Sequence, residues 1–320
     1  MKAIVYHKYG SPDVLQIEEV DQPTPKNDEV LVKLRAASIN DWDWGLLRGK
    51  PLVNRMFSLL RPKYKILGTD MAGRVEAVGM NAKRFTPGDE VFGDLSATGF
   101  GGFAEYVCAH ENALTLKPAS MTFEQAAAIP HAAALALQGL RYKRQIQPGK
   151  KVLFNGAGGG AGTFAIQIAR TFGANVTAVD SSEKLDMLSS LGAEHVIDYT
   201  KEDFTKTGRR YDLIIDVKSY RSVFDYRRAL NPGGICVSLG GSMPRIFLNV
   251  LVGSLFSMIE GKKVGVLLHR PNQDMPFLNE LFESGKVVPV IDKTYPLSEV
   301  PEALRRFGEG RQIGKIVITL

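Results

Sequence analysis

Residues 151–162 read KVLFNGAGGGAG, in which an apolar run leads directly into a loop rich in glycine. The helix-forming segment TFAIQIARTFG (163–173) follows. A strand, a glycine loop and a helix in this order build a phosphate site, because backbone N–H groups at the start of the helix face the ligand. The loop reads AxGxxG, with alanine in place of the first glycine of the GxGxxG fingerprint. A flexible turn is the alternative, but we predict a dinucleotide site formed by Ala157, Gly158, Gly159, Gly160, Ala161 and Gly162.

Two glycines and a downstream acid refine this prediction. Gly159 lets the backbone approach the phosphates closely, and Gly162 lets the helix pack tightly against the strand. Asp180 closes the next predicted strand, where a carboxylate hydrogen-bonds the adenosine ribose 2′-hydroxyl and repels a 2′-phosphate. Within an NAD(P)H cofactor class, Asp180 therefore favours NADH. NADPH stays open, because side chains suited to a phosphate follow at once, namely Ser181, Ser182 and Lys184.

The order of the predicted elements divides the chain into two domains. From 119 to 265, strands alternate with helices, as in the strand YDLIIDV (211–217) and the helix SVFDYRRAL (222–230). This alternation predicts an α/β domain with a parallel, doubly wound Rossmann sheet. Residues 1–118 contain short β-branched runs between turns, which predict a β-rich, barrel-like domain. The strand pattern of 266–320 matches the first domain, so we expect this segment to complete it.

Composition narrows the class of partner. The chain has 320 residues and a net charge of +6, but its basic residues are scattered and lack aromatic neighbours, so we expect no nucleic-acid partner. Its two cysteines do not suggest a disulfide framework, and the N-terminus does not read as a signal peptide, so we expect a cytoplasmic protein. The apolar run 246–259 is shorter than the ~20 residues that span a bilayer. We expect a buried helix or a lid over an apolar pocket, with peripheral membrane contact left open.

Several motifs together resemble one enzyme superfamily. Besides the glycine loop, the chain contains AGRVEAVG (72–79), PGDEVFG (87–93), GGFAEYV (101–107), LGAEHVIDY (191–199) and NPGG (231–234). With them, essentially the whole sequence resembles the medium-chain dehydrogenase/reductase superfamily. The C-terminal segments, GKVVPVIDKTYPLSEVPEAL and GKIVITL, are similar to its zinc-independent quinone oxidoreductase-like branch. The resemblance implies a β-rich GroES-like catalytic domain beside the Rossmann domain, an NAD(P)H cofactor and a homodimer.

The resemblance also shows where a catalytic zinc would lie. Zinc-dependent members hold the metal with a cysteine, the GHE motif and a later cysteine or aspartate. Here ASIND (37–41) stands where the cysteine would be, and GTD (68–70) replaces GHE, so that Thr69 takes the place of the histidine. The lobe with four cysteines is absent, and the five histidines form no pair with ligand spacing. We expect no metal, and a structural or pocket-edge role for His131.

Without a metal, hydrogen bonds have to polarise the substrate. Asn40 and Asp43 in NDWDW fit the N-x-x-D pattern of the zinc-less branch, and the resemblance implies that they border the nicotinamide. Asn40 is then a donor to a carbonyl or a cofactor group, and Asp43 orients the network or relays a proton. Equally, Asp43 caps the helix that follows, and Trp42 and Trp44 are core residues rather than an aromatic slot. Tyr64 is a further candidate proton donor.

Topology adds cofactor contacts at the carboxyl ends of the parallel strands. The resemblance implies that Tyr199 lies beside the adenosine and that Leu239, Gly240 and Gly241 approach the nicotinamide with backbone groups. The segment DVKS (216–219) departs from the D-x-x-G often found in the family, which leaves its contacts open.

These features predict an oxidoreductase that transfers hydride from NAD(P)H to a quinone or an α,β-unsaturated carbonyl. Such acceptors are small and lipophilic, and their low-lying acceptor orbitals reduce the need for Lewis-acid help. The cofactor carries the hydride chemistry, and the protein supplies orientation and electrostatics. One alternative is an enoyl-thioester reductase. Another is a non-catalytic scaffold that binds the cofactor or a membrane surface.

Overall fold

The computed structural model describes residues 1–55 and 58–320, and the chain forms two compact units. The β-rich unit comprises Met1–Ala134, Pro271–Glu283 and Pro289–Leu320. The Rossmann unit comprises Leu135–Arg270 and Ser284–Val288.

The borders of the units differ from the predicted domain borders at 118 and 266. Helix α2 (Phe123–Ala127) packs on strands of the β-rich unit, so that unit continues past the predicted end. The division falls inside helix α3 (Pro130–Leu140). An alanine-rich helix carries no pattern that tells which of two sheets it covers, which explains the difference.

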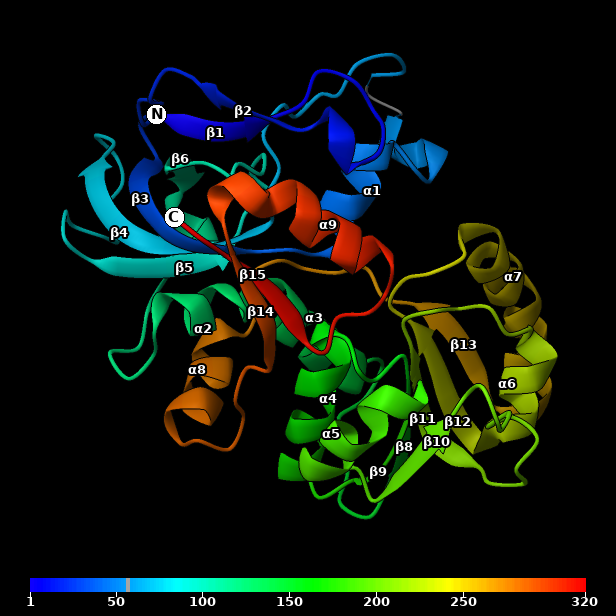
Figure 1. Ribbon diagram of the computed structural model, residues 1–320. Helices are drawn as coiled ribbons and strands as arrows, with labels where there is room; N and C mark the ends of the chain where they lie inside the picture. The colour runs from blue at the N-terminus through cyan, green and yellow to red at the C-terminus, as the bar shows by residue number, and fades with distance from the viewer. Residues whose placement is uncertain (56–57) are drawn as a thin grey trace. The chain divides into compact units, whose positions relative to one another are not determined.

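The Rossmann unit is built on a six-stranded parallel sheet with the order β10-β9-β8-β11-β12-β13. Its elements are β8 (Lys151–Asn155), α4 (Gly160–Thr171), β9 (Asn175–Asp180), α5 (Leu185–Ser190), β10 (His195–Asp198), β11 (Tyr211–Asp216), α6 (Val223–Ala229), β12 (Leu230–Ser238), α7 (Met243–Glu260) and β13 (Lys263–Val266). Helices α4 and α5 cover one face of this sheet, and α6 and α7 cover the other (Figure 1). This arrangement confirms the predicted doubly wound fold.

The strand order of this sheet defines its ligand-binding edge. The order reverses at β8, which has β9 on one side and β11 on the other. Because both faces are covered, the central strands are largely apolar, and Leu153, Val179 and Ile214 belong to one buried cluster with Tyr226 of α6. In such sheets ligands bind outside the carboxyl ends of the strands at the reversal.

The β-rich unit contains a seven-stranded sheet and a separate β1–β2 hairpin. The sheet has the order β14-β15-β3-β4-β5-β7, and β6 also pairs with β3. The elements of this unit are β1 (Lys2–Val5), β2 (Gln16–Glu19), β3 (Glu29–Ser38), α1 (Asp41–Arg48), β4 (Asp70–Val78), β5 (Glu90–Asp94), β6 (Tyr106–His110), β7 (Thr115–Leu116), α2, α8 (Met275–Glu283), β14 (Ile291–Pro296), α9 (Val300–Gly308) and β15 (Lys315–Thr319).

The last strand of the chain, β15, lies between β14 and β3 in this sheet. Strand β15 runs antiparallel to β3, with Val317 opposite Ser38, and the Ile39 N–H donates to the Ile316 carbonyl at 3.1 Å. The same register places Ile316 opposite Ile39 and Lys315, the first residue of β15, opposite Asn40. The C-terminal segment therefore reaches the stretch that carries the candidate catalytic residues.

The apolar run 246–259 lies in α7, which packs against β12, β13 and α6. Ile246 is buried, but Phe247 on the next position is 72% exposed. The side chains of 254–260 lie outside the described part of the chain, so the prediction of a buried helix or lid stays open for residues 254–259. Among the described residues, no helix is long and apolar enough to cross a membrane.

Candidate active site

The glycine loop is anchored on strand β9. The N–H groups of Gly156 and Ala157 both donate to the Val179 carbonyl, at 3.0 and 3.1 Å. The N–H of Gly158 donates to Asp180 Oδ2 at 2.7 Å. These bonds fix the loop between β8 and α4, so the loop is ordered by its neighbours and is not a flexible turn.

Two glycines of the loop have different structural roles. A Cβ on Gly162 would lie 2.5 Å from the Ala157 Cα, which is too close for any side chain. A Cβ on Gly159 would find no atom nearer than the Gly156 oxygen at 4.0 Å. Gly159 is the N-cap of α4, whose first N–H groups have no acceptor within the helix. The space above Gly159 therefore fits the phosphates of NAD(P)H.

The adenosine end of the predicted site contains Asp180 and Lys184. Besides Gly158, Asp180 accepts a hydrogen bond from the Ser181 N–H at 2.9 Å, and Lys184 Nζ lies 3.8 Å from its Oδ1. Tyr199 follows β10, donates its N–H to the Asp180 carbonyl at 3.1 Å and leaves its side chain 56% exposed. The structure thus brings Asp180, Ser181, Lys184 and Tyr199 together at the carboxyl edge of β9 and β10.

Asp198, at the end of β10, was not predicted as part of this edge. It accepts hydrogen bonds from the Ser182 hydroxyl and from Thr200, and these bonds hold its pKa well below the usual range. Asp198 therefore stays charged and holds the Ser182 hydroxyl. The available signal was its position, since Asp198 ends its strand as Asp180 does.

Leu239, Gly240 and Gly241 follow directly after β12, as predicted. The Leu239 N–H donates to the Asp216 carbonyl at 2.9 Å, which ties this turn to β11. Gly241 has a φ of 104°, and a Cβ there would collide with the Lys218 carbonyl. Only glycine fits this close approach, so the backbone of the turn stays accessible at the carboxyl edge of the sheet.

The segment DVKS, whose contacts the sequence left open, organises the reversal point of the sheet. Asp216 Oδ1 accepts the N–H groups of Lys218 and Ser219, each at 2.7 Å. Its Oδ2 accepts from Asn155 Nδ2 at 3.0 Å and from the Tyr226 hydroxyl at 2.6 Å. The Asn155–Asp216 bond joins the ends of β8 and β11, so a buried aspartate holds the site where the strand order reverses.

In the β-rich unit, Asn40 belongs to a buried polar cluster with Asp70 and Lys315. Asn40 Nδ2 donates to Asp70 Oδ2 at 2.9 Å, and Lys315 Nζ donates to Asn40 Oδ1 at 2.6 Å. Lys315 also donates to Asp70 Oδ2 at 3.3 Å. Burial raises the pKa of Asp70, although the Lys315 ammonium opposes the shift. The cluster holds Asn40 as a fixed amide with 6% exposure.

Asp43 lies next to this cluster but is completely buried. Its Oδ2 accepts the Asn40 N–H at 2.8 Å and its Oδ1 accepts the Gly68 N–H at 2.9 Å. Asn40 is the N-cap of α1 and Asp43 its third residue, so the first bond belongs to a capping box. The structure favours the capping role over proton relay, because no face of Asp43 is open to a substrate.

The other aromatic candidates do not join the cluster. Trp42 is exposed, whereas Trp44 packs against Gly308 of α9 and under the Arg48 guanidinium, so the two rings form no slot. Tyr64 packs edge-on against Phe100, with 4.9 Å between ring centroids. Among the described residues, no recorded contact links the Tyr64 hydroxyl to Asn40.

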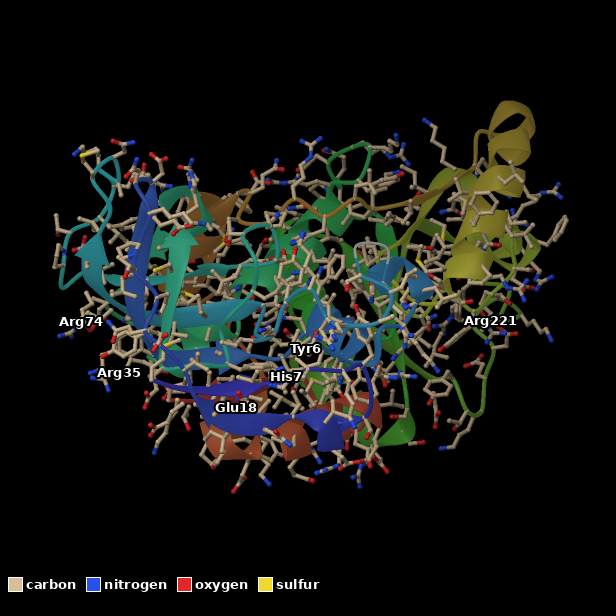
Figure 2. The ribbon with its side chains drawn as sticks, turned by 90° about the horizontal axis from the view of Figure 1, so that it is seen from above. Tyr6, His7, Glu18, Arg35, Arg74 and Arg221 are labelled. Carbon is tan, nitrogen blue, oxygen red and sulfur yellow. The ribbon has the colours of Figure 1, made fainter. Side chains whose placement is uncertain are left out.

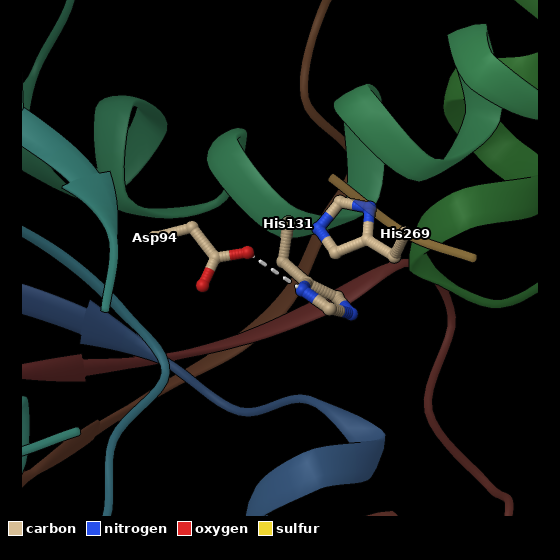
Figure 3. A group of neighbouring side chains, drawn as sticks. All are labelled: Asp94, His131 and His269. Carbon is tan, nitrogen blue, oxygen red and sulfur yellow. Dashed lines mark hydrogen bonds and ion pairs between the residues drawn. The ribbon is translucent and has the colours of Figure 1, made fainter. Parts of the chain in front are cut away.

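His131 joins the polar cluster from helix α3. Its Nδ1 lies 2.8 Å from Asp94 Oδ2 (Figure 3), and its N–H donates to Asp70 Oδ1 at 3.0 Å. Burial, the largest single influence, lowers the pKa of His131, but the hydrogen bond to Asp94 and the charges of Asp94 and Asp70 together outweigh it, and the net shift is upward. His7, by contrast, contacts Glu18 at 3.0 Å on the β1–β2 hairpin (Figure 2). His131 is therefore buried and bonded to two aspartates, and its structural or pocket-edge role stays a prediction.

Sequence reasoning missed Lys315, Asp70 and Asp94. Asp70 and Asp94 face each other across β4 and β5, and Lys315 opens a strand whose next three residues are buried. A lysine at the start of a buried strand, in GKIVITL, is a signal that was available. The partners of Lys315 could not be predicted from the sequence, because they depend on the pairing of β15 with β3.

The buried Asp43 leads to a prediction on pH. Burial raises its pKa to about 7, although the N–H groups of Asn40 and Gly68 favour the charged form. The folded state then binds more protons than the unfolded state between pH about 4 and 7. Relative to Asp43→Asn, the unfolding free energy of the wild type should fall as pH rises through this window, by about 4 kcal/mol at most, and stay level above it.

Urea unfolding of both proteins at several pH values measures this difference. Because the asparagine does not titrate, any constant loss caused by its weaker capping cancels from the pH dependence. A difference that stays the same from pH 4 to 8 would show that Asp43 has an ordinary pKa.

Three protein-family models match parts of the chain. The model of the alcohol dehydrogenase GroES-like domain matches residues 26–119, that of the alanine dehydrogenase/PNT C-terminal domain matches 136–217, and that of the zinc-binding dehydrogenases matches 191–318. The 2-methylene-furan-3-one reductase of Solanum lycopersicum is 37% identical, over 99% of this chain and 79% of the relative. The NADPH-dependent alkenal/one oxidoreductase, chloroplastic, of Arabidopsis thaliana is 34% identical over the same shares.

A solved structure, the quinone oxidoreductase from Coxiella burnetii, superimposes with a TM-score of 0.90 at 28% identity, covering 100% of this chain and 99% of that one. The chain therefore belongs to the medium-chain dehydrogenase/reductase superfamily, in its quinone oxidoreductase-like branch. This confirms the resemblance found in the sequence and the combination of a GroES-like with a Rossmann domain.

One matched family is named for zinc, so the fit of a zinc ion has to be tested on the residues present. Zinc sites of this kind use thiolate and imidazole ligands. Asn40 and Thr69 offer neither, and the Lys315 ammonium lies 2.6 Å from Asn40 Oδ1. A second cation beside it would be repelled in this buried cluster. The residues at the zinc-ligand positions therefore do not fit a zinc ion.

Proposed function

We propose that this protein is a zinc-independent reductase that transfers hydride from NAD(P)H to quinones or α,β-unsaturated carbonyls. The central support is the Asn40–Asp70–Lys315 cluster, in which a fixed amide and an ammonium replace the ligands of a metal. The open loop at Gly159 supports binding of the cofactor. The names of the relatives from tomato, Arabidopsis and Coxiella fit the same class of acceptor.

Bound NAD(P)H would supply the hydride. The loop from Ala157 to Gly162 would hold the pyrophosphate with backbone N–H groups, and the turn from Leu239 to Gly241 would hold the nicotinamide end. Asn40 would donate a hydrogen bond to the acceptor oxygen, where negative charge builds up as hydride arrives. A donor preorganised in a buried site stabilises such charge more than water does.

The cofactor class is NAD(P)H, but the preference for NADH that Asp180 suggested is not supported. The carboxylate of Asp180 already accepts the N–H groups of Gly158 and Ser181 and lies near Lys184, so a 2′-phosphate would meet a partly neutralised acid. The Arabidopsis relative is named as NADPH-dependent. We therefore propose that both cofactors bind.

The Asp180–Lys184 pair should set the ratio between the two cofactors. Asp180→Ala removes an acceptor for the ribose 2′-hydroxyl and the negative charge that would repel a 2′-phosphate. We expect the affinity ratio of NADPH to NADH to rise about tenfold, which corresponds to about 1.4 kcal/mol. Lys184→Met should move the ratio in the opposite direction. Fluorescence titration with both cofactors measures the ratio, and an equal loss for both in Asp180→Ala would limit Asp180 to anchoring the loop.

The function is tested by following oxidation of NADPH and NADH by the purified protein at 340 nm. A simple quinone, an α,β-unsaturated aldehyde and an enoyl thioester serve as acceptors. Turnover with the quinone or the aldehyde supports the proposal, and turnover with the thioester alone favours the enoyl-thioester reductase. Cofactor binding without turnover favours the scaffold. Loss of activity in EDTA with recovery in zinc would disprove zinc independence.

Three further points belong to the proposal. From the family resemblance we propose that the protein forms a homodimer. We also propose a cytoplasmic location. Contact of the run 246–259 with a membrane surface is an alternative. The Arabidopsis relative is named as chloroplastic, so location is not uniform among the relatives. Light scattering would measure the oligomeric state, and co-sedimentation with anionic vesicles would detect membrane contact.

A further inference from the structure

Lys315 is a buried cation whose three ammonium protons all have acceptors. Its side chain is 3% exposed. Nζ donates to Asn40 Oδ1 at 2.6 Å, to the Ile39 carbonyl at 3.2 Å and to Asp70 Oδ2 at 3.3 Å. A lysine in bulk water turns freely, but this one is held by two adjacent residues and one charge partner. Its positive charge therefore has a fixed position beside Asn40.

The two charges of the cluster dictate the orientation of the Asn40 amide. The amide oxygen faces the ammonium of Lys315, and the amide nitrogen faces the carboxylate of Asp70. In the flipped orientation, the NH₂ group would face the ammonium and the oxygen would face the carboxylate, so both contacts would become repulsive. In a buried site such contacts are costly, and a single orientation results.

This orientation leaves one amide hydrogen of Asn40 for a ligand. An asparagine amide has two N–H donors, and Asp70 takes one of them. The oxygens of Asp70 accept four bonds in all, from Ser38, Asn40, Lys315 and the His131 N–H, which matches the capacity of a carboxylate. No other recorded acceptor among the described residues bonds to Asn40 Nδ2. The second N–H has a fixed direction and no recorded acceptor.

We propose that Lys315 is a positioning residue of this enzyme. It fixes the Asn40 amide so that the remaining N–H meets the oxygen of the acceptor. Lys315 does not touch the acceptor itself. The inference rests on the proposed function, in which Asn40 is the donor, and it explains how an amide suffices where relatives with zinc use a metal.

The first test compares two buried lysines of the β-rich unit. Lys117 is 4% exposed, pairs with Glu90 at 3.0 Å and donates to two carbonyls, so Lys117→Met removes a comparable ion pair away from Asn40. We expect Lys315→Met to lower kcat about 10- to 100-fold with little change in the Kd of NADPH. Lys117→Met should change kcat less than threefold, even where its thermal stability falls as much.

A double-mutant cycle then asks whether Lys315 acts through Asn40. If it does, Lys315→Met should not lower kcat further in the Asn40→Ala background. If the two losses multiply, Lys315 acts independently and the proposal is wrong. Lys315→Arg keeps the charge and should recover part of the kcat lost in Lys315→Met. If Lys315→Met does not fold, Lys315→Arg replaces it in the double-mutant cycle.

A spectroscopic readout keeps this inference separate from the proposed function. With ¹⁵N-labelled asparagine, the Asn40 side-chain amide can be assigned by its loss in Asn40→Ala. We expect two sharp proton signals in the wild type, in Lys117→Met and in Lys315→Arg, and signals that are shifted or broadened by flipping in Lys315→Met. An unchanged Asn40 amide in Lys315→Met overturns the role of Lys315, whether or not the enzyme turns over. Missing turnover in the wild type overturns the proposed function instead.

Discussion

Replacing Gly162 with alanine is expected to weaken both the fold and the binding of NAD(P)H. A Cβ at this position would lie 2.5 Å from the Ala157 Cα and within contact of the Ala157 carbonyl, and backbone atoms cannot turn aside. Helix α4 has to shift away from the loop, which should cost about 1–3 kcal/mol of unfolding free energy. Because the same shift moves the N–H groups that face the phosphates, cofactor affinity should fall by more than tenfold. Denaturant unfolding and fluorescence titration measure the two losses.

Gly159→Ala is the matched control for this prediction. Gly159 has a φ of −88°, which alanine adopts without strain, and its Cβ would enter open space. The unfolding free energy should therefore change by less than about 1 kcal/mol, whereas cofactor affinity should still fall because the methyl group occupies the place of a phosphate. If Gly159→Ala binds NAD(P)H as tightly as the wild type, the cofactor does not use this loop in the predicted register.

The Rossmann unit could be predicted from the sequence because each of its steps is local. A buried strand, a short loop and a helix repeat along the chain, and the residues that contact a dinucleotide end the strands or follow them. Asp180 and the loop after β8 could be located in this way without knowledge of any distant partner. Asp198 and Asp216 obey the same rule, so they were accessible to the same reasoning.

The polar cluster of the β-rich unit could not be predicted in this way. Lys315 and Asn40 are separated by 275 positions, and their contact depends on the antiparallel pairing of β15 with β3. The sequence indicated that the C-terminal segment completes this unit, but not which strand it joins. A shift of one residue would turn Lys315 to the other face of the sheet. The positions of Asn40 and Thr69 were therefore recognised, but the cation beside Asn40 was not.

Asp43 shows how burial separates two interpretations that the sequence leaves equal. The pattern N-x-x-D suits a proton relay as well as a capping box, since both place a carboxylate three residues after an asparagine. In the structure, both carboxylate oxygens of Asp43 accept hydrogen bonds from backbone N–H groups, and the residue is completely buried. A carboxylate near an active site, such as that of Asp43, can thus stabilise the backbone that positions the reacting group instead of taking part in the reaction.

Asn40→Ala is expected to lower kcat by about 100- to 1000-fold with quinone and enone acceptors. These are the losses seen when one preorganised donor to a developing oxyanion is removed, about 3–4 kcal/mol of transition-state stabilisation. Lys315 and Asp70 remain paired with each other at 3.3 Å in the variant, so the buried charges do not lose their counter-ion. The Kd of NADPH should change little, because the predicted cofactor contacts belong to the Rossmann unit. Steady-state kinetics together with cofactor titration separate the two quantities.

Ser38→Ala distinguishes a missing donor from a disturbed cluster. The Ser38 hydroxyl donates to the same Asp70 Oδ2 at 3.1 Å and is equally buried, but it does not hold the amide of Asn40. Its removal should cost about 1 kcal/mol of unfolding free energy and change kcat less than threefold. Equal losses of kcat in both variants would mean that the integrity of the cluster, rather than the Asn40 donor, supports turnover. A large loss in Asn40→Ala alone would identify this amide as the group that the acceptor oxygen meets, since the two side chains share one acceptor and differ in the N–H that remains free.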